Sequence, residues 1–304
     1  MLVSVLMPNY NYGRYISGAI ESVLNQTFED FELIIFDDCS TDDSRKTIES
    51  YQGKDKRIKS FFHEKNMGIA LTTNDLQSKA SGKYIAHLDS DDLWEHSKLS
   101  RQLAILQKND SMVVWSEGRV IDENGVPTGK TFTQMNSATK KKKSGIIFEE
   151  LLFGNFIFRS SLIYKRDFAK DIRYDAALKF LNDYKFVVNL AKNQPFYFIK
   201  EPLAKYRLHG KNIILSTDRV RNLDNLTINK YFLRQYGLEM SERARANLLF
   251  KTARNYHFLN QKDLSKLFLI RALNNNFVLY QLKYGLFSPR KSFIVSRDFL
   301  ELLL

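Results

Sequence analysis

The chain has 304 residues with a formal net charge of +12, and 44% of its residues are hydrophobic. That length suits one large domain or one domain with an appendage. The single cysteine, Cys39, excludes an internal disulfide framework and fits a reducing compartment, and no stretch is long and apolar enough to span a membrane. The excess of positive charge indicates an anionic partner. Composition alone does not decide whether this partner is nucleic acid, acidic lipid or a phosphorylated substrate.

The first hundred residues are predicted to alternate between strands and helices. Apolar runs indicate strands at residues 3–8, 31–36, 58–63 and 84–88. Helical spacings indicate helices at residues 14–25, 42–52, 68–80 and 95–108. This alternation predicts an α/β fold with a mostly parallel sheet, in which ligands bind beyond the carboxyl ends of the strands. Residues 2–8 read as a strand rather than a signal peptide, so we expect a cytoplasmic protein.

Three of these strands end in polar or acidic loops. The loops carry Pro8-Asn9-Tyr10, Asp37-Asp38, and the triplet Asp89, Asp91 and Asp92. Three carboxylates within four positions repel one another, and they stay ionised together only if a cation or abundant water compensates. The triplet therefore suggests a hard divalent metal such as Mg²⁺ or Mn²⁺, while a solvated turn that caps the next helix is the alternative.

Between residues 109 and 210 the pattern is less regular. Strands are predicted at residues 112–115, 155–164, 196–199 and 203–207, and helices at residues 148–154 and 177–192. Residues 122–125, D-E-N-G, are a hairpin-turn signal. Residues 140–143 are four lysines that we expect to be solvated rather than to bind a ligand. Asp183 lies near the start of the second helix, and His209 follows the last strand.

From about residue 216 the strand patterns disappear and apolar residues fall at helical spacings. We therefore expect two domains, a sheet domain at residues 1–215 and a helical region at residues 216–304. Residues 241–304 contain eleven Lys or Arg against four Asp or Glu. A basic amphipathic region of this kind can lie on an anionic membrane surface. The alternative is a helical hairpin that packs on the sheet domain or on a second subunit in a homodimer.

Four motifs occur in a fixed order between residues 3 and 210. They are V-S-V-L-M-P-N-Y-N, then F-D-D-C-S-T-D-D-S, then N-M-G-I-A with A-S-G-K-Y-I-A-H-L-D-S-D-D, and last N-D-Y-K-F with Y-R-L-H-G. With these motifs the sequence resembles the inverting glycosyltransferases of family 2, of the bacterial surface-polysaccharide type. The resemblance implies the GT-A fold, a Rossmann-like, mostly parallel sheet with flanking helices, and it does not cover the region after residue 215.

The same resemblance implies a catalytic base, a donor site and a metal site. Asp183 would remove the proton of the acceptor hydroxyl, and Arg207 would support either the loop that carries His209 or the phosphates. The residues that would bind the donor nucleotide are Pro8, Asn9, Tyr10, Asp38, Asn66 and Asp89. The residues that would hold Mn²⁺ or Mg²⁺ are Asp91, Asp92 and His209.

Two positions depart from the family pattern. Many members have Glu-Asp where this chain has Asn182-Asp183, and the second acid is retained. An arginine often follows the N-x-G turn, whereas Thr72-Thr73-Asn74 stands here, so a phosphate contact is missing or is supplied elsewhere, for example by a lysine. At the start of a helix Asp183 is expected to have a lowered pKa, unless burial opposes the effect.

The resemblance implies a metal-dependent transferase that moves a hexose or N-acetylhexosamine from a nucleotide-sugar, with a UDP-sugar as the favoured donor. The acceptor would be a hydroxyl of a glycan or lipid-linked glycan precursor, at the inner face of the cell membrane. No nucleic-acid partner is expected, because acidic strand ends repel phosphate. A D-x-D-x-T phosphatase and a G-x-G-x-x-G dinucleotide enzyme do not match these motifs. A non-catalytic protein that binds nucleotide-sugars or nucleic acid is the remaining alternative.

Overall fold

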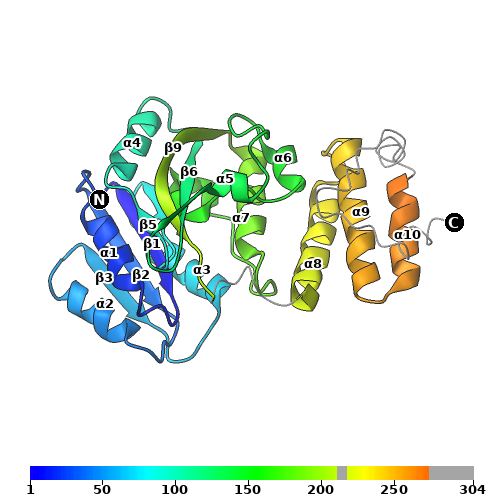
Figure 1. The fold of residues 1–304 in the computed structure, drawn as a ribbon. Helices are drawn as coiled ribbons and strands as arrows, with labels where there is room; N and C mark the ends of the chain where they lie inside the picture. The colour runs from blue at the N-terminus through cyan, green and yellow to red at the C-terminus, as the bar shows by residue number, and fades with distance from the viewer. Residues whose placement is uncertain (211–217, 274–304) are drawn as a thin grey trace. The chain divides into compact units, whose positions relative to one another are not determined.

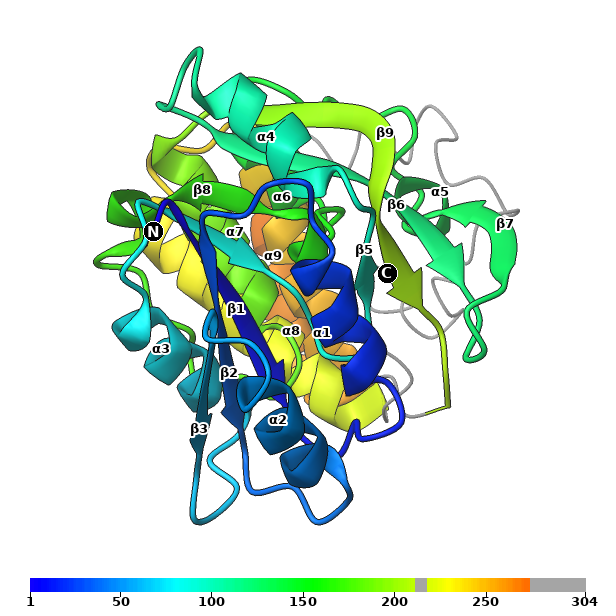
Figure 2. The same cartoon turned by 90° about the vertical axis from the view of Figure 1, so that its left-hand side faces the viewer.

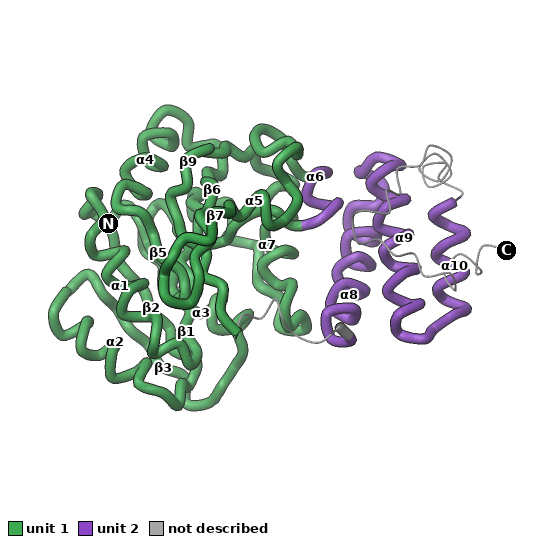
Figure 3. The backbone as a smooth tube through the Cα atoms, viewed as in Figure 1, with its two compact units in different colours: residues 1–148, 155–212 green, residues 149–154, 213–304 purple. Residues whose placement is uncertain are grey.

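The computed structural model describes residues 1–210 and 218–273 and divides the chain into two compact units (Figures 1 and 3). Unit 1 comprises Met1–Phe148 and Asn155–Asn212, and unit 2 comprises Glu149–Gly154 and Ile213–Leu304. The sheet belongs to unit 1, and the helices of the C-terminal region belong to unit 2. The predicted boundary at residue 215 lies outside the described residues.

The first half of unit 1 confirms the predicted alternation. Its strands are β1 (Val3–Asn9), β2 (Phe31–Asp37), β3 (Ile58–Phe62) and β4 (Tyr84–His87). Its helices are α1 (Ile16–Leu24), α2 (Ser44–Gln52), α3 (Ile69–Lys79) and α4 (Lys98–Leu106). The strands pair in parallel in the order β3-β2-β1-β4, so their carboxyl ends lie at one edge of the sheet.

The second half adds mixed pairing to this parallel sheet. Its strands are β5 (Leu93–Trp94), β6 (Val113–Ile121), β7 (Pro127–Thr131), β8 (Ile163–Lys165) and β9 (Phe196–Arg207). The full order is β3-β2-β1-β4-β8-β6-β9-β5, with β8 antiparallel to β4 and β6, and β9 parallel to β6. The predicted hairpin turn joins β6 to the antiparallel β7, with Gly125 at a φ of 88°.

The remaining helices before residue 210 are short, except for α7. They are α5 (Phe132–Met135), α6 (Phe148–Leu152), the 3-10 helices η1 (Arg159–Ser161) and η2 (Arg166–Ala169), and α7 (Asn182–Asn193). The strand predicted at residues 155–164 is wrong over most of its length, because η1 breaks it and only β8 follows. The two strands predicted at residues 196–207 are one strand, β9, whose pairing with β6 shifts register near Pro202.

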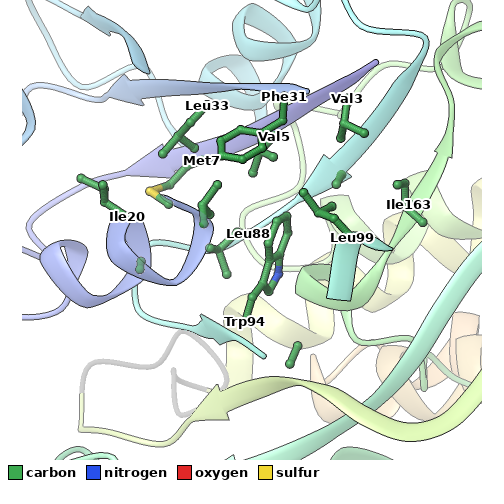
Figure 4. Close-up of a cluster of buried hydrophobic side chains, with 14 of the residues drawn as sticks. Val3, Val5, Met7, Ile20, Phe31, Leu33, Leu88, Trp94, Leu99 and Ile163 are labelled. Carbon is green, nitrogen blue, oxygen red and sulfur yellow. The ribbon is translucent and has the colours of Figure 1, made fainter. Parts of the chain in front are cut away.

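The core of unit 1 lies between the sheet and its helices. Figure 4 shows side chains from β1 and β2, such as Met7 and Leu33, in one cluster with Leu88, Trp94 and Leu99. All of these side chains are buried. The indole Nε1 of Trp94 donates a hydrogen bond to the Ser160 carbonyl oxygen at 2.6 Å. The core thus fixes the segments before and after the acid triplet, which lies between β4 and β5.

The described part of unit 2 confirms a helical region over residues 218–273. Its helices are α8 (Asp218–Tyr236), α9 (Glu242–Phe258) and α10 (Lys262–Leu273). Ser241 caps α9, because its Oγ accepts from the Ala244 N–H at 3.2 Å and its own N–H donates to Glu149 Oε1 at 2.7 Å. Among the described residues, every helix is too short or too polar to cross a bilayer. The proposed membrane and dimer contacts stay predictions, and residues 274–304 lie outside the described part.

Candidate active site

The polar residues predicted to bind a ligand lie at the carboxyl edge of the parallel strands. In the registers of the sheet, Asn9 lies beside Asp37, and Leu6 lies beside His87, two residues before Asp89. Figure 2 shows β1, β2 and β3 side by side, with α2 following β2. A site at this edge is the usual arrangement in an α/β sheet.

Asn9 is buried and holds the loop after β2. Its Nδ2 donates to Asp37 Oδ2 at 2.7 Å and to Ser40 Oγ at 3.3 Å, so Asp37 has a structural role in this loop. Asn9 Oδ1 is buried and has no hydrogen-bond partner. Pro8 is buried within β1, whereas Tyr10 is 44% exposed. At the end of β1, Asn9 Oδ1 and the Tyr10 ring are therefore the groups that remain for contact with a ligand.

Asp38 is buried, and its carboxylate holds the turn before α3. Its two oxygens accept hydrogen bonds from the N–H groups of Met67 and Gly68, each at 2.8 Å. Asp38 Oδ1 also lies 2.8 Å from His63 Nδ1, and His63 Nε2 lies 3.0 Å from Asp75 Oδ2. His63 follows β3 and was not among the predicted site residues, because only the pairing of β3 with β2 brings it to Asp38.

The residues from the N-x-G turn into α3 have structural contacts. Asn66 is exposed, and the contact with Asp38 comes from the backbone of the next two residues. Asn74 Nδ2 donates to the Tyr174 carbonyl at 2.9 Å, and its Oδ1 accepts from the Tyr174 N–H at 2.8 Å. The residues that stand in place of the family's arginine thus provide no cation. Among the described residues, Arg159 pairs with the Asp89 carboxylate and Arg207 Nε donates to the Asp91 carbonyl. The lysine suggested as a phosphate contact stays a prediction.

The 3-10 helix η1 clamps the acid triplet. Arg159 forms an ion pair with Asp89, in which Nη2 contacts Oδ1 and Nε lies 3.4 Å from Oδ2. Ser160 Oγ donates to Asp92 Oδ2 at 2.6 Å and accepts from the Asp89 N–H at 3.1 Å. The sequence pointed to a strand here, so neither residue was predicted. Motif spacing alone does not predict that η1, about 70 residues further along the chain, contacts the acid triplet.

Asp92 is buried, and both of its oxygens hold the loop. Oδ1 accepts from the Arg207 N–H at 3.0 Å, and Oδ2 accepts from Ser160. Burial, followed by the charges of Asp91 and Asp89, raises the pKa of Asp92 well above its usual value. Asp92 is therefore neither solvated nor a cap of the next helix but ties η1 to β9, and its role as a metal ligand stays a prediction.

Asp91 and His209 are brought together as predicted, across 118 positions of the chain. Asp91 Oδ2 lies 3.0 Å from His209 Nε2. The imidazole stacks on Tyr15 at a centroid distance of 5.0 Å and meets the edge of Tyr12 at 5.5 Å. Arg207 Nε donates to the Asp91 carbonyl at 2.8 Å, so Arg207 supports this loop as expected. Burial raises the pKa of Asp91, although its hydrogen bond to His209 opposes the rise.

The Asp91–His209 pair fits a divalent cation in part. Among the described residues, no group of three or more His, Cys, Asp and Glu side chains could hold a metal ion. A carboxylate oxygen and an imidazole nitrogen are suitable ligands for Mn²⁺, and burial works against an ionised Asp91 when no cation is bound. The pair therefore suits a cation that takes its other ligands from a diphosphate and water.

Asp183 lies in the first turn of α7 and is half-buried. Its Oδ1 accepts from the Tyr184 N–H at 2.7 Å. Burial raises its pKa, while the nearby Arg159 charge and the Tyr184 N–H lower it. Burial opposes the lowering expected from the helix end, as the expectation allowed, and it outweighs the amides and the arginine. A raised pKa suits a general base, which works best when its pKa is close to the working pH.

A hollow elsewhere in unit 1 lacks this chemistry. It has a volume of about 560 Å³ and lies at the amino ends of β1 and β4, where Leu2, Lys83 and Asp110 line it. Asp110 there is paired with Lys83 at 3.0 Å and with Lys165 at 3.4 Å. Ligands of parallel sheets bind at the opposite edge, so the acid triplet is the better candidate.

Comparisons with known proteins agree with this site. The model of the family described as "Glycosyl transferase family 2" matches residues 4–172. The chain is 31% identical to the putative teichuronic acid biosynthesis glycosyltransferase TuaG of Bacillus subtilis, over 70% of this chain and 81% of that protein. It is 34% identical to an Escherichia coli protein, over 55% of this chain and 67% of that one. The name of that relative is UDP-Glc:alpha-D-GlcNAc-diphosphoundecaprenol beta-1,3-glucosyltransferase WfgD.

Among solved structures, the chain is similar to S. aureus TarS 1-349 in complex with UDP-GlcNAc. The TM-score is 0.63 at 19% identity, and the match covers 94% of this chain and 92% of that one. At this identity the likeness supports the GT-A fold alone. The family match covers more than half of the chain, and the motifs, the fold and the acidic site agree with it. The chain therefore belongs to glycosyl transferase family 2 and is a glycosyltransferase with a GT-A fold followed by C-terminal helices.

Proposed function

We propose that this enzyme transfers one hexose or N-acetylhexosamine from a UDP-sugar to a hydroxyl of a glycan or lipid-linked glycan precursor, with the help of a divalent metal. The observation that carries the proposal is the pair of Asp91 and His209 in the same loop as Asp89, whose partner Arg159 also feels the charge of Asp183. In this proposal Asp91 and His209, which anchor the leaving diphosphate, and the base Asp183 belong to one site. The name of WfgD, with its UDP-Glc donor and diphosphoundecaprenol-linked acceptor, supports the choice of substrates.

In this proposal Asp183 removes the proton of the acceptor hydroxyl as its oxygen attacks the anomeric carbon. The bond from that carbon to the diphosphate breaks, the new glycosidic bond forms on the opposite face, and UDP leaves. Asp91 and His209 would hold Mn²⁺ or Mg²⁺, which supplies positive charge to the diphosphate when bound. Arg207 keeps these two ligands together through the Asp91 carbonyl and the neighbouring Asp92.

The donor base would lie near the ends of β1 and β2. Asn9 Oδ1 is a buried acceptor without a partner, and the half-exposed ring of Tyr10 offers a stacking face. Asp38 Oδ2 accepts one hydrogen bond, from Gly68, so a lone pair remains for the N3–H of uracil. Two acceptors at this position would favour a base that donates an imide N–H.

A thermal-shift panel tests the proposal. The purified chain is heated with UDP, GDP, dTDP or CMP, each with and without Mn²⁺. We expect UDP with Mn²⁺ to raise the melting temperature most, and Asp91→Asn to remove the metal-dependent part of that rise. Failure of every nucleotide to stabilise the protein with Mn²⁺ would contradict the proposal. Nucleotide binding without UDP release from any UDP-sugar, in the presence of glycan acceptors, would favour the non-catalytic alternative.

A further inference from the structure

Two tyrosines between β1 and α1, neither of them among the predicted site residues, contact the imidazole of His209. The N–H groups of Tyr15 and Ile16 donate to the Tyr12 carbonyl oxygen at 2.8 and 3.0 Å, and this turn leads into α1. It brings the two tyrosine rings to a centroid distance of 6.3 Å. The Tyr15 ring stacks on the imidazole at 5.0 Å with an interplanar angle of 25°, whereas the Tyr12 ring meets it edge-on at 5.5 Å.

The ring of Tyr15 also contacts Arg207. The guanidinium carbon of Arg207 lies 4.9 Å from the centre of this ring, a distance at which a cation is attracted to an aromatic face. Arg207 in turn donates from Nε to the Asp91 carbonyl and from its backbone N–H to Asp92. One ring at the start of α1 therefore lies against both of the residues, Arg207 and His209, that contact Asp91 from the end of β9 and the loop after it.

The contact between His209 and Asp91 fixes one atom of the imidazole but not the plane of its ring. Nε2 lies 3.0 Å from Asp91 Oδ2, and a ring held only there could turn about that contact. A second ring against its face and a third against its edge restrict this rotation. An imidazole coordinates a metal through a lone pair in the ring plane, so the orientation of His209 determines whether it can act as a ligand.

We propose that Tyr15, with Tyr12 beside it, is a positioning residue of the metal site, which holds His209 in the orientation that binds Mn²⁺ or Mg²⁺. This rests on the function proposed above, in which Asp91 and His209 hold the cation. Tyr15 acts through the face of its ring rather than through its hydroxyl. Phenylalanine should therefore replace it, whereas an aliphatic side chain should not.

Binding of Mn²⁺ to the full chain in the presence of UDP tests this proposal. Free Mn²⁺ is followed through its electron paramagnetic resonance signal while the protein is titrated. In Tyr15→Leu we expect the dissociation constant of Mn²⁺ to rise about tenfold, as is typical when a residue that orients a metal ligand is lost. In Tyr15→Phe the constant should stay within about twofold of the wild-type value, because the stacking face is kept.

A second measurement separates positioning of the metal ligand from damage to the donor site. UDP binding is measured by calorimetry at Mn²⁺ concentrations that saturate each variant. Tyr15→Leu should then bind UDP like the wild type, since its defect lies in the affinity for the metal. Tyr51→Leu is the matched control and should leave Mn²⁺ binding unchanged. Tyr51 is a half-buried tyrosine at the end of α2, with Lys54 over its ring at 5.7 Å and its hydroxyl bonded to Glu21.

Several results would overturn this inference and leave the proposed function intact. They are wild-type Mn²⁺ affinity in Tyr15→Leu, an equal loss in Tyr15→Phe or in the control, and weak UDP binding by Tyr15→Leu that persists at saturating metal. If the wild type binds no Mn²⁺ in the presence of UDP, the metal in the proposed function fails and this proposal fails with it. Melting temperatures are recorded for each variant, and Tyr15→Met replaces Tyr15→Leu if the latter does not fold.

Discussion

At the scale of single residues, Arg159 faces two carboxylates that have different tasks. It forms an ion pair with Asp89, and its charge lowers the pKa of Asp183. Burial raises the pKa of Asp183, and Arg159 limits the rise. The pKa of Asp183, the proposed base, is therefore set by a balance between burial and one nearby cation, while the N–H groups at the helix end contribute less.

Removing the charge of Arg159 should move the pH dependence of the reaction. In Arg159→Gln the pKa of Asp183 rises further, so the base remains protonated up to a higher pH and the acidic limb of the kcat profile moves upward. We expect a movement of about one pH unit. The charge of Asp89 also raises the pKa of Asp183, and Asp183 in turn raises the pKa values of Tyr174 and Tyr206.

Arg159→Lys keeps the charge and should keep the wild-type pH profile, even though it loses the second nitrogen. A profile of Arg159→Gln that coincides with that of the wild type would show that Asp183 is not the titrating base.

Asp183→Asn should separate catalysis from binding. The amide has nearly the same shape but cannot take a proton, so we expect transfer to fall by at least about a hundredfold. UDP binding, measured by the same thermal shift, should stay near the wild-type value. Asp175→Asn is a suitable control, because Asp175 is paired with Lys185 at 2.6 Å and has no predicted role. Loss of UDP binding in Asp183→Asn would move this residue from the base to the donor site.

At the scale of elements, buried polar side chains tie the strands of the parallel sheet together. Glu32 of β2 is buried and accepts from Ser4 Oγ of β1 at 2.6 Å and from Lys59 Nζ of β3 at 2.6 Å. It also accepts from the Ser81 N–H and Oγ at 2.9 and 2.7 Å, just before β4. One carboxylate thus connects all four strands. These hydrogen bonds outweigh its burial and lower the pKa of Glu32 to about 2.

Glu32→Gln should destabilise unit 1 in a pH-dependent manner. The pKa is lower in the folded chain than in the unfolded chain, so the carboxylate stabilises the fold above about pH 4.5 and loses this effect as the pH falls toward 2. We expect a loss of roughly 2 to 3 kcal/mol in the free energy of unfolding at neutral pH. Urea denaturation followed at several pH values measures it.

Glu49→Gln, which removes an exposed ion pair with Arg45, is the matched control and should change stability by less than about 0.5 kcal/mol. A difference between wild type and Glu32→Gln that does not shrink as the pH falls would contradict the ionised carboxylate.

At the scale of the whole molecule, unit 2 has an exposed surface with both apolar and basic side chains. In unit 2 the helix α10 exposes Leu264, Leu267 and Ile270, three residues at helical spacing. Its basic residues include Lys262 and Lys266. This combination of apolar and basic side chains is typical of helices that lie on anionic membranes, and it supports the proposed contact with a membrane surface.

Sedimentation with liposomes tests that contact. The full chain should pellet with vesicles that contain phosphatidylserine, less so at high salt, and not with neutral vesicles, because each cation near the surface contributes about 1 kcal/mol. A double variant, Lys262→Glu with Lys266→Glu, should reduce pelleting, whereas Lys46→Glu on the exposed part of α2 should not. Equal pelleting with neutral and anionic vesicles, or none with either, would favour a packing or dimer role for these helices.

By itself, the sequence determined the alternation of elements in the first hundred residues, the acids at the strand ends and the family, since all of these depend on local periodicity and motif order. It also placed Asp91 with His209, because the motifs carry that pairing. Only the tertiary structure decided the clamp by Arg159 and Ser160, the single long strand β9 and the raised pKa of Asp183. These features depend on which distant segments meet and on how much water they exclude, and the spacing of residues along the sequence predicts neither.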